Sequence, residues 1–271
     1  ALARCGGGWQ GLDVSVCLPL AIILLGFAFL GALDDARGLS PLVRLLVEVG
    51  LVGVALLFMP PLWMGLDSLP GTRGLLAVFL IVTGANAFNM SDNADGLAAG
   101  TGCLSFLAAY LVPGLPGSLA LAALAAAGAL AGFLFWNRPP ARLYLGDVGT
   151  LPLGALLACA LVIRAEPLSV IQALAALLMA GYLIFDPLYA VAGRLGRGRA
   201  PWKGGVDHPS HDLRRLFGRW PPAWRLILGV HAFSVLTGWG VMIGILPSAA
   251  IPVGLLSWSA LLVVAMRGRA R

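Results

Sequence analysis

Long apolar segments joined by short polar loops are the feature that most limits how this chain can fold. A helix that crosses a bilayer needs about 20 mostly apolar residues, and it bonds all of its own backbone groups. Only 11% of the residues are charged and 59% are hydrophobic, whereas soluble domains carry about 25% charged residues. We therefore expect one integral membrane domain over residues 1–271, an all-α polytopic transmembrane bundle of about nine spans: residues 14–33, 42–60, 73–90, 97–113, 118–136, 149–164, 168–186, 224–246 and 250–266.

The distribution of basic residues predicts the orientation of this bundle. With alternate loops on opposite sides, 15 of the 18 Lys and Arg residues fall on one side, and only Arg4, Arg73 and Arg164 fall on the other. Cytoplasmic loops carry the excess of Lys and Arg, so the first side is expected to face the cytoplasm of a bacterial inner membrane. The same bias explains the net charge of +6 without a nucleic-acid partner. The first apolar segment lacks a typical cleavage site, so we expect it to be a span and not a signal peptide.

Carboxylates gather at the predicted cytoplasmic ends of the spans. Asp34, Asp35, Asp92, Asp95 and Asp147 all lie there, in three separate loops. A charge at the centre of the bilayer costs roughly 2.5–3.5 kcal/mol, and a water-accessible mouth avoids that cost. The pattern therefore predicts an active site at the cytoplasmic face, assembled from distant parts of the chain.

A polar stretch of eleven residues, Asn86 to Gly96, closes one apolar segment and opens the next. Asn86, Asn89 and Asn93 recur at three- and four-residue spacing and would share one face of a helix, as would Asp92 and Asp95. Polar side chains in such surroundings are usually kept for function. The simpler alternative is a polar turn between two membrane helices.

Two further groups of acids admit both a functional and a structural interpretation. The pair Asp34-Asp35 ends the first span, where it could bind a metal or a phosphate, or could be a solvated helix stop. Asp147 lies between Gly146 and Gly149, where the backbone can approach closely, and is a plausible ligand for a hard cation such as Mg²⁺. An aspartate at this position could equally cap the next helix, and both roles could hold.

Two histidines lie in the one long hydrophilic segment, residues 193–222. His208 and His211 are three residues apart and precede Arg214 and Arg215, so they could face one anion. Zinc needs three or four ligands, and the segment has no Cys, so phosphate contact is favoured over a structural zinc site. The alternative is that both are inert, exposed loop residues.

Four motifs in order then resemble a known family. They are L-D-D-x-x-x-L-S-P (33–41), N-A-F-N-M-x-D-x-x-D-G-L-A-A-G (86–100), L-G-D-V-G-T (145–150) and D-H-x-S-H (207–211). Together they resemble the polyprenyl-phosphate N-acetylhexosamine-1-phosphate transferases, or glycosyltransferase family 4, over about residues 20–266. The resemblance implies transfer of a sugar 1-phosphate from a UDP-sugar to a membrane polyprenyl phosphate, with release of UMP.

The same resemblance implies a cofactor and roles for individual residues. Mg²⁺ is the implied cofactor, with Mn²⁺ as an alternative, and a homodimer is an alternative to the monomer. The expected site residues are Asp147 and Asp35 on the metal; Asp34, Asp35, Asp147, His208 and His211 in catalysis; and Asn86, Asn89, Asp92, Asp95 and Arg214 on the substrates.

Some positions depart from the family pattern. Asn93 stands where many members have Gly, Thr150 replaces a common Ser, and Asp212 stands where related members often have Arg. The family usually has ten or eleven spans, so we expect this chain to lack one or two amino-terminal helices of that arrangement.

The resemblance leaves the substrate and the activity open. Ala36-Arg37 and the spaced histidines favour UDP-GlcNAc as donor, with the muramyl-pentapeptide precursor as the second choice. The product would serve cell-wall or surface polysaccharide synthesis. An inactive relative that still binds lipid phosphate or nucleotide sugar, and a membrane transporter, are the alternatives to an enzyme.

Overall fold

The computed structural model describes residues 14–58, 70–163, 169–202 and 204–269, which form eleven helices and no strand. The helices are α1 (Val14–Arg37), α2 (Pro41–Leu57), α3 (Pro70–Ser91), α4 (Leu97–Leu111), α5 (Gly117–Asn137), α6 (Gly146–Val162), α7 (Val170–Met179), α8 (Gly181–Leu195), α9 (Pro209–Phe217), α10 (Trp220–Met242) and α11 (Ala250–Arg269). The expectation of an all-helical protein is confirmed.

The expectation of nine spans is not confirmed. By length and composition, α1, α3, α5, α10 and α11 could each cross a membrane, and α7 with α8 could form a sixth, bent span. The helices α2, α4 and α6 have only 17, 15 and 17 residues. A 15-residue helix is about 22 Å long, which is less than the hydrocarbon thickness of about 30 Å. The chain is thus a multi-pass membrane protein with five or six candidate spans of full length among the described residues.

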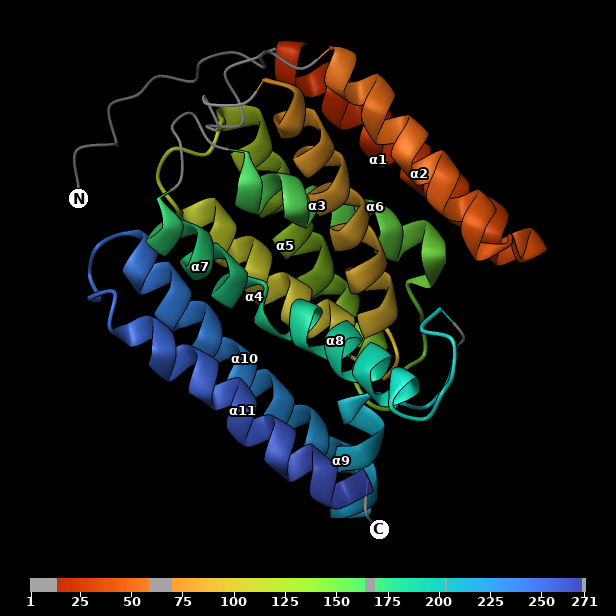
Figure 1. Ribbon diagram of the computed structural model, residues 1–271, viewed down its shortest axis with the longest axis vertical. Coiled ribbons are helices and arrows are strands. Elements are labelled where there is room, and N and C mark those ends of the chain that lie inside the picture. The colour runs from red at the N-terminus through yellow and green to blue at the C-terminus, as the bar shows by residue number, and fades with distance from the viewer. Residues whose placement is uncertain (1–13, 59–69, 164–168, 203, 270–271) are drawn as a thin grey trace.

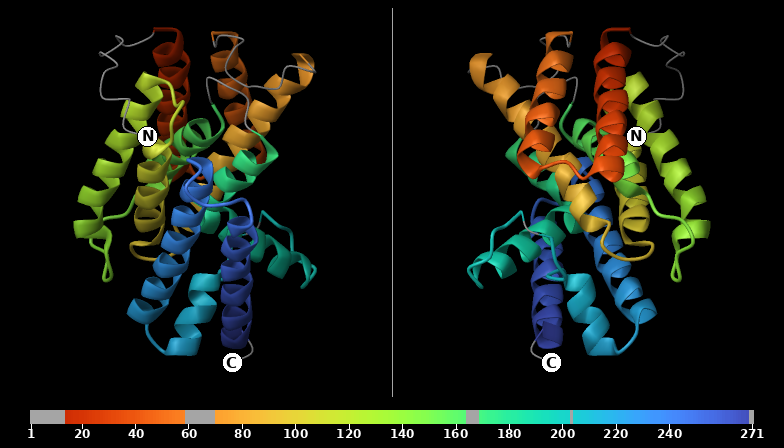
Figure 2. Two further views of the ribbon diagram at one scale, coloured as in Figure 1. Left: turned by 90° about the vertical axis from the view of Figure 1, so that its left-hand side faces the viewer. Right: turned by 90° about the vertical axis from the view of Figure 1, so that its right-hand side faces the viewer.

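The helices form two groups that pack side by side (Figures 1 and 2). The helices α1 and α2 lie at one side of the molecule and α10 and α11 at the other, with α3, α6 and α8 between them (Figure 1). The larger apolar core takes residues from α1 to α8 and from α10 and α11, and a second, smaller core around Tyr182, Leu213 and Trp258 joins α8 to α11 with Leu97 of α4. Many large apolar side chains point outward from α2, such as Leu42, Leu46 and Leu57, as expected of a surface that meets lipid.

The break between α7 and α8 corrects the expected single span over residues 168–186. The two helices meet at 79°, and α8 continues to Leu195. The Tyr182 N–H donates to His231 Nδ1 over 3.2 Å, and the Ser105 hydroxyl donates to the Met179 carbonyl over 2.7 Å. All of these groups are buried, where an unbonded backbone group would be costly. Side chains of α4 and α10 therefore stabilise the bend and fix the direction in which α8 leaves it.

Candidate active site

The end of α1 and the beginning of α6 are held together by a close backbone approach. A Cβ atom on Gly31 would lie 2.3 Å from the Asp147 carbonyl oxygen, so only glycine fits there. One turn later, Asp35 Oδ1 and Oδ2 accept the N–H groups of Asp147 and Val148 over 3.0 and 3.1 Å. Gly146 has a φ of +62°, and a Cβ on it would lie 2.7 Å from Asp35 Oδ2. The Asp35 carboxylate therefore binds the free N–H groups in the first turn of α6.

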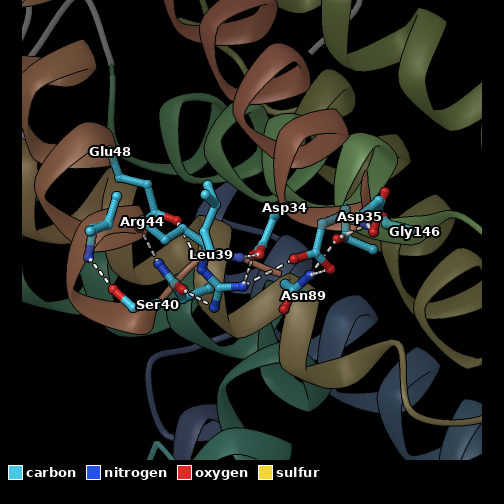
Figure 3. Close-up of polar contacts among 12 residues, drawn as sticks. Asp34, Asp35, Leu39, Ser40, Arg44, Glu48, Asn89 and Gly146 are labelled. Carbon is cyan, nitrogen blue, oxygen red and sulfur yellow. Dashed lines mark hydrogen bonds and ion pairs between the residues drawn. The ribbon is translucent and has the colours of Figure 1, made fainter. Parts of the chain in front are cut away.

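The acidic cluster consists of the carboxylates of Asp34, Asp35, Glu48, Asp92 and Asp147 and the side chains of Arg44, Asn86 and Asn89 beside them. Arg44 of α2 lies at its centre (Figure 3). Its Nη1 is 2.9 Å from Asp34 Oδ2 and 3.0 Å from Asp147 Oδ2. Its Nη2 donates to Asn86 Oδ1 over 3.1 Å, and Glu48, one turn further along α2, lies 3.7 Å from its Nε. One guanidinium thus joins the ends of α1 and α3, the start of α6 and the middle of α2.

The polar face of α3 completes this cluster. Asn89 Nδ2 donates to Asp147 Oδ1 over 2.6 Å and to Thr150 Oγ1 over 2.8 Å, and Asn86 Nδ2 donates to Glu48 over 2.5 Å. Every oxygen of the Asp147 carboxylate therefore has a donor in the protein. The two asparagines share a face of α3, as their spacing predicts.

Asp92 follows the end of α3, and its carboxylate lacks the hydrogen-bond donors that Asp147 has. Among the described residues, no donor bonds its carboxylate. Burial, together with the neighbouring charges of Asp147 and Asp95, raises the pKa of Asp92 to about 6. Asp92 is therefore a carboxylate whose negative charge is costly until a cation or a hydrogen-bond donor arrives.

A pocket of about 400 Å³ opens on the other side of the same turn. Asn93 and Asp95 form one wall, and Ser210, His211 and Arg214 of α9 form the opposite wall. Its remaining lining consists of Ala94, Pro139, Pro140, Trp220 and Pro221. The turn after α3 thus contributes Asp92 to the acidic cluster and its next residues to the pocket, so the two sites are neighbours.

The two predicted histidines have different surroundings. His208 is 5% exposed, and its Nδ1 lies 2.9 Å from Asp186 Oδ2. His211 is partly exposed and lines the pocket. Burial lowers the pKa of His211, and the nearby His208, Arg215 and Arg214 lower it further, against the opposing effect of Asp186. The lowered pKa favours the neutral imidazole of His211, which has one donor and one acceptor nitrogen.

The family model described as glycosyl transferase family 4 matches residues 17–166, which is more than half of the chain. The chain belongs to glycosyl transferase family 4. Its matched segment contains Asp34, Asp35, Arg44, Asn89 and Asp147, which belong to the acidic cluster.

Three curated relatives that this chain resembles share one name. A phospho-N-acetylmuramoyl-pentapeptide-transferase from Nostoc punctiforme is 31% identical over 244 residues, which cover 82% of this chain and 61% of the relative. Proteins of that name from Gloeothece citriformis and Limosilactobacillus reuteri are 35% and 33% identical over 164 and 170 residues, covering 52% and 55% of this chain and 44% and 52% of the relatives. The chain spans about half the length of the curated relatives it matches.

The acidic cluster of this glycosyl transferase family 4 chain can be tested for its fit to Mg²⁺. No group of three His, Cys, Asp or Glu residues with metal-site geometry occurs in the part of the chain that the structure describes. Asp34 Oδ2 and Asp147 Oδ2, however, converge on one nitrogen of Arg44, so a cationic group already lies between them. Mg²⁺ often takes one or two carboxylates and fills its other positions with water and phosphate oxygens. Asp147 and Asp34 are the acids that could hold Mg²⁺, because the donor they share is the Arg44 side chain, which a cation can displace. Both oxygens of Asp35 instead accept backbone N–H groups of α6, which are fixed by the helix.

Three charged residues of the site were not among those selected from the sequence. They are Arg44, Glu48 and Asp186. An Arg and a Glu four residues apart in an otherwise apolar helix are a recognisable signal, because ionisable residues in such helices are rare and usually paired. The sequence around Asp186 has the composition of a membrane span. Only the structure, in which α8 leaves α7 at a bend, shows that Asp186 lies next to His208.

The raised pKa of Asp92 predicts a pH-dependent stability. Unfolding returns the Asp92 carboxyl to its ordinary pKa of 3.8, so between pH 4 and 6 the folded state binds the extra proton and stability falls as pH rises. Above pH 6 the cost is roughly 3 kcal/mol. We expect Asp92→Asn to raise the melting temperature in detergent and EDTA by several degrees at pH 7.5 and by less than half as much at pH 4.5. An equal gain at both pH values would refute this origin of the effect.

The pocket position of His211 predicts a loss of activity without a loss of stability. We expect His211→Ala to lower kcat/KM for sugar-phosphate transfer about 10- to 100-fold, because a hydrogen bond to a charged group is worth about 1.5–3 kcal/mol. His211→Gln keeps a neutral donor and acceptor and should recover much of the loss. Wild-type kinetics in His211→Ala, with the protein folded as judged by its melting curve, would make this histidine a bystander.

Proposed function

We propose that the protein transfers an N-acetylhexosamine 1-phosphate from a UDP-sugar to a polyprenyl phosphate and releases UMP. The observation that carries this proposal is the convergence of Asp34, Asp147 and Arg44 beside a pocket that His211 and Arg214 line. Phosphoryl transfer depends mostly on positioning and on neutralising charge. A site of this composition at the end of membrane helices suits one soluble anionic substrate and one lipid substrate.

In this reaction, a phosphate oxygen of the lipid forms a bond to the phosphorus that bears the sugar. The bond from that phosphorus to the bridging oxygen of UMP breaks, and UMP takes the electron pair. Arg44 would neutralise phosphate oxygens from the α2 side, and Asn89 orients Asp147 by donating to its Oδ1. Asp35 holds the first turn of α6, which places Asp147. Mg²⁺ held by Asp147 and Asp34 would supply further positive charge for the two phosphate groups.

The pocket would receive the nucleotide part of the donor. Asp95 Oδ2 accepts the Ala141 N–H over 3.0 Å, and the Trp220 indole N–H donates to the Asp95 carbonyl over 3.0 Å, so this wall is rigid. Arg214 and His211 on the opposite wall suit a phosphate or a uracil carbonyl. Asp95 and Arg214 are proposed substrate contacts on this basis.

Two donors are supported by different observations. The spacing of His208 and His211, with Ala36-Arg37 after the acid pair, favours UDP-GlcNAc. The name shared by the curated relatives favours the UDP-linked muramyl pentapeptide. The excess of 15 basic residues over 3 supports a cytoplasmic site in a bacterial inner membrane, and cell-wall or surface polysaccharide synthesis as the use of the product.

A transfer assay tests this proposal directly. Membranes that contain the protein receive polyprenyl phosphate, Mg²⁺ and either radiolabelled UDP-GlcNAc or the labelled UDP-muramyl pentapeptide, with UDP-glucose as a control donor. We expect labelled lipid and UMP in equal amounts with one of the first two donors. Membranes containing Asp147→Asn are the matched control. If no donor gives labelled lipid, the protein is an inactive relative and the proposed function is wrong.

A further inference from the structure

The Asp186 carboxylate of α8 is fully buried and bonds donors from three elements. Its Oδ1 accepts the Tyr182 hydroxyl over 2.9 Å, and its Oδ2 lies 2.9 Å from His208 Nδ1. Asn93 Nδ2 lies 3.2 and 3.1 Å from the two oxygens. A buried carboxylate is stable only when donors surround it, and here they come from α8 itself, from the turn after α3 and from the start of α9.

These contacts determine which nitrogen of His208 carries the proton. A carboxylate can only accept, so His208 Nδ1 bears the hydrogen that faces Asp186. Asn93 Nδ2 also lies 3.0 Å from this Nδ1, but it donates to the Met90 carbonyl and to Asp186 and not to the ring. Arg194 Nη2 lies 3.4 Å from His208 Nε2, and a guanidinium can only donate, so Nε2 accepts. Both ring nitrogens are therefore bonded within the protein. This buried ring has no nitrogen left for a phosphate.

Asn93 connects the same carboxylate to the wall of the pocket. The Ser210 hydroxyl donates to Asn93 Oδ1 over 2.5 Å, while Asn93 Nδ2 faces Asp186. Asn93 follows Asp92 of the acidic cluster, and Ser210 precedes His211 of the pocket. Asn93 thus joins the turn after α3 to α9 at the point where the two walls meet.

We infer that Asn93, Asp186, His208 and Ser210 form a buried lock that sets the distance between the two walls of the pocket, and that His208 is a positioning residue. The inference rests on the proposed function for its kinetic consequences. Through the lock, α8 holds α9 so that His211 and Arg214 face Asp95 across the pocket. The stabilised bend between α7 and α8 gives Asp186 its place.

A direct chemical role for His208 makes a different prediction from a positioning role. Asparagine can place its Nδ2 where the histidine has Nδ1, so it can donate to Asp186 without an imidazole. If His208 transferred protons or bound phosphate, His208→Asn would be as inactive as His208→Phe. If His208 holds α9 in place, His208→Asn recovers what His208→Phe loses.

The experiment compares these two variants with Tyr182→Phe. The Tyr182 change removes one buried hydrogen bond from the same carboxylate and leaves the four lock residues in place, so it is the matched control. We expect kcat/KM for transfer to fall at least about 30-fold in His208→Phe and to stay within about 5-fold of wild type in His208→Asn and 3-fold in Tyr182→Phe. The dependence of kcat on pH should be the same in His208→Asn as in wild type.

Hydrogen–deuterium exchange of residues 209–217 gives a second readout that needs no activity. Exchange should rise in His208→Phe and stay at the wild-type rate in His208→Asn. Three results would overturn the inference. They are equal inactivity of the two variants, a pH dependence of kcat in His208→Asn that lacks one of the wild-type transitions, and unchanged exchange in His208→Phe. A wild-type protein without transfer would overturn only the proposed function, because the exchange comparison would still test the lock.

Asn93→Ala serves if His208→Phe does not fold in detergent. Asn93 is only half-buried, so its loss should leave the melting temperature within a few degrees of wild type. We expect at least a 10-fold fall in kcat/KM and faster exchange in residues 209–217. Wild-type values of both would overturn the inference.

Discussion

Replacing Asp147 by asparagine is expected to lower kcat/KM for sugar-phosphate transfer by about a thousandfold or more. The Asp147 side chain lies between Arg44 on one oxygen and Asn89 on the other. Asparagine keeps the shape and one acceptor oxygen, so the variant should fold, and its defect should report the lost negative charge. Charge stabilisation by a metal ion is worth several kcal/mol in such reactions, and about 4 kcal/mol corresponds to a thousandfold in rate.

The measurement for Asp147→Asn combines kinetics with metal binding. Mg²⁺ should raise the melting temperature of the wild-type protein and leave that of Asp147→Asn unchanged, because a ligand stabilises only the state that binds it. Asp212→Asn is a suitable control for the melting shift with Mg²⁺, since it removes a buried carboxylate bonded to Tyr189, Arg215 and Arg269, away from the acidic cluster. Turnover of Asp147→Asn at the wild-type rate in limiting Mg²⁺ would exclude Asp147 from metal binding.

The convergence of acids from distant segments could be predicted from the sequence. Spans that alternate in direction bring every second loop to the same face, and charged side chains avoid the bilayer centre. Asp34, Asp35 and Asp147 accordingly meet where α1 ends and α6 begins. Which acid does what could not be predicted, because it depends on distances below 3 Å. Asp35 bonds the first turn of α6, while Asp34 shares Arg44 with Asp147. The assigned roles in catalysis remain predictions.

The three asparagines Asn86, Asn89 and Asn93 show where helical spacing no longer predicts which side chains share a face. Asn86 and Asn89 do share a face of α3, but α3 ends at Ser91, so Asn93 no longer follows that face. Asn93 instead faces Asp186, 93 positions later in the chain. A spacing rule assumes a continuous helix, and nothing in residues 86–96 except Gly96 marks the end of one.

The hydrophilic segment after α8 illustrates a second limit. We expected a loop over residues 193–222, yet α9 forms there between Pro209 and Phe217. Its apolar residue Leu213 is buried between α8 and α10, and Asp212 bonds Arg269 of α11. A nine-residue helix is too short to be stable alone, and tertiary contacts decide whether it forms. Local composition therefore could not reveal it.

Removing Arg44 should have the second-largest effect, on stability as well as on activity. We expect Arg44→Ala to lower the free energy of unfolding by about 3 kcal/mol, the lower end of the range for a broken buried ion pair, because Arg44 and two of its partners are only partly buried. The partners are Asp34, Asp147 and Glu48, of which Glu48 is fully buried. Transfer should fall at least about 100-fold. Arg44→Lys keeps the charge but not the planar fork that reaches two carboxylates and Asn86 at once, so it should fall between wild type and Arg44→Ala.

Thermal melting in detergent and the transfer assay together separate these expectations. Arg37→Ala is the matched control, because Arg37 is exposed at the end of α1, close to Arg44 in sequence. Adding Glu48→Gln to Arg44→Ala removes the buried acid that Arg44 leaves behind, and the double variant should be more stable than Arg44→Ala alone. Such coupling is expected only for residues that share an interaction. If Arg44→Ala melted and turned over like Arg37→Ala, the guanidinium would not be the centre of the acidic cluster, and the proposed convergence on it would have no functional meaning.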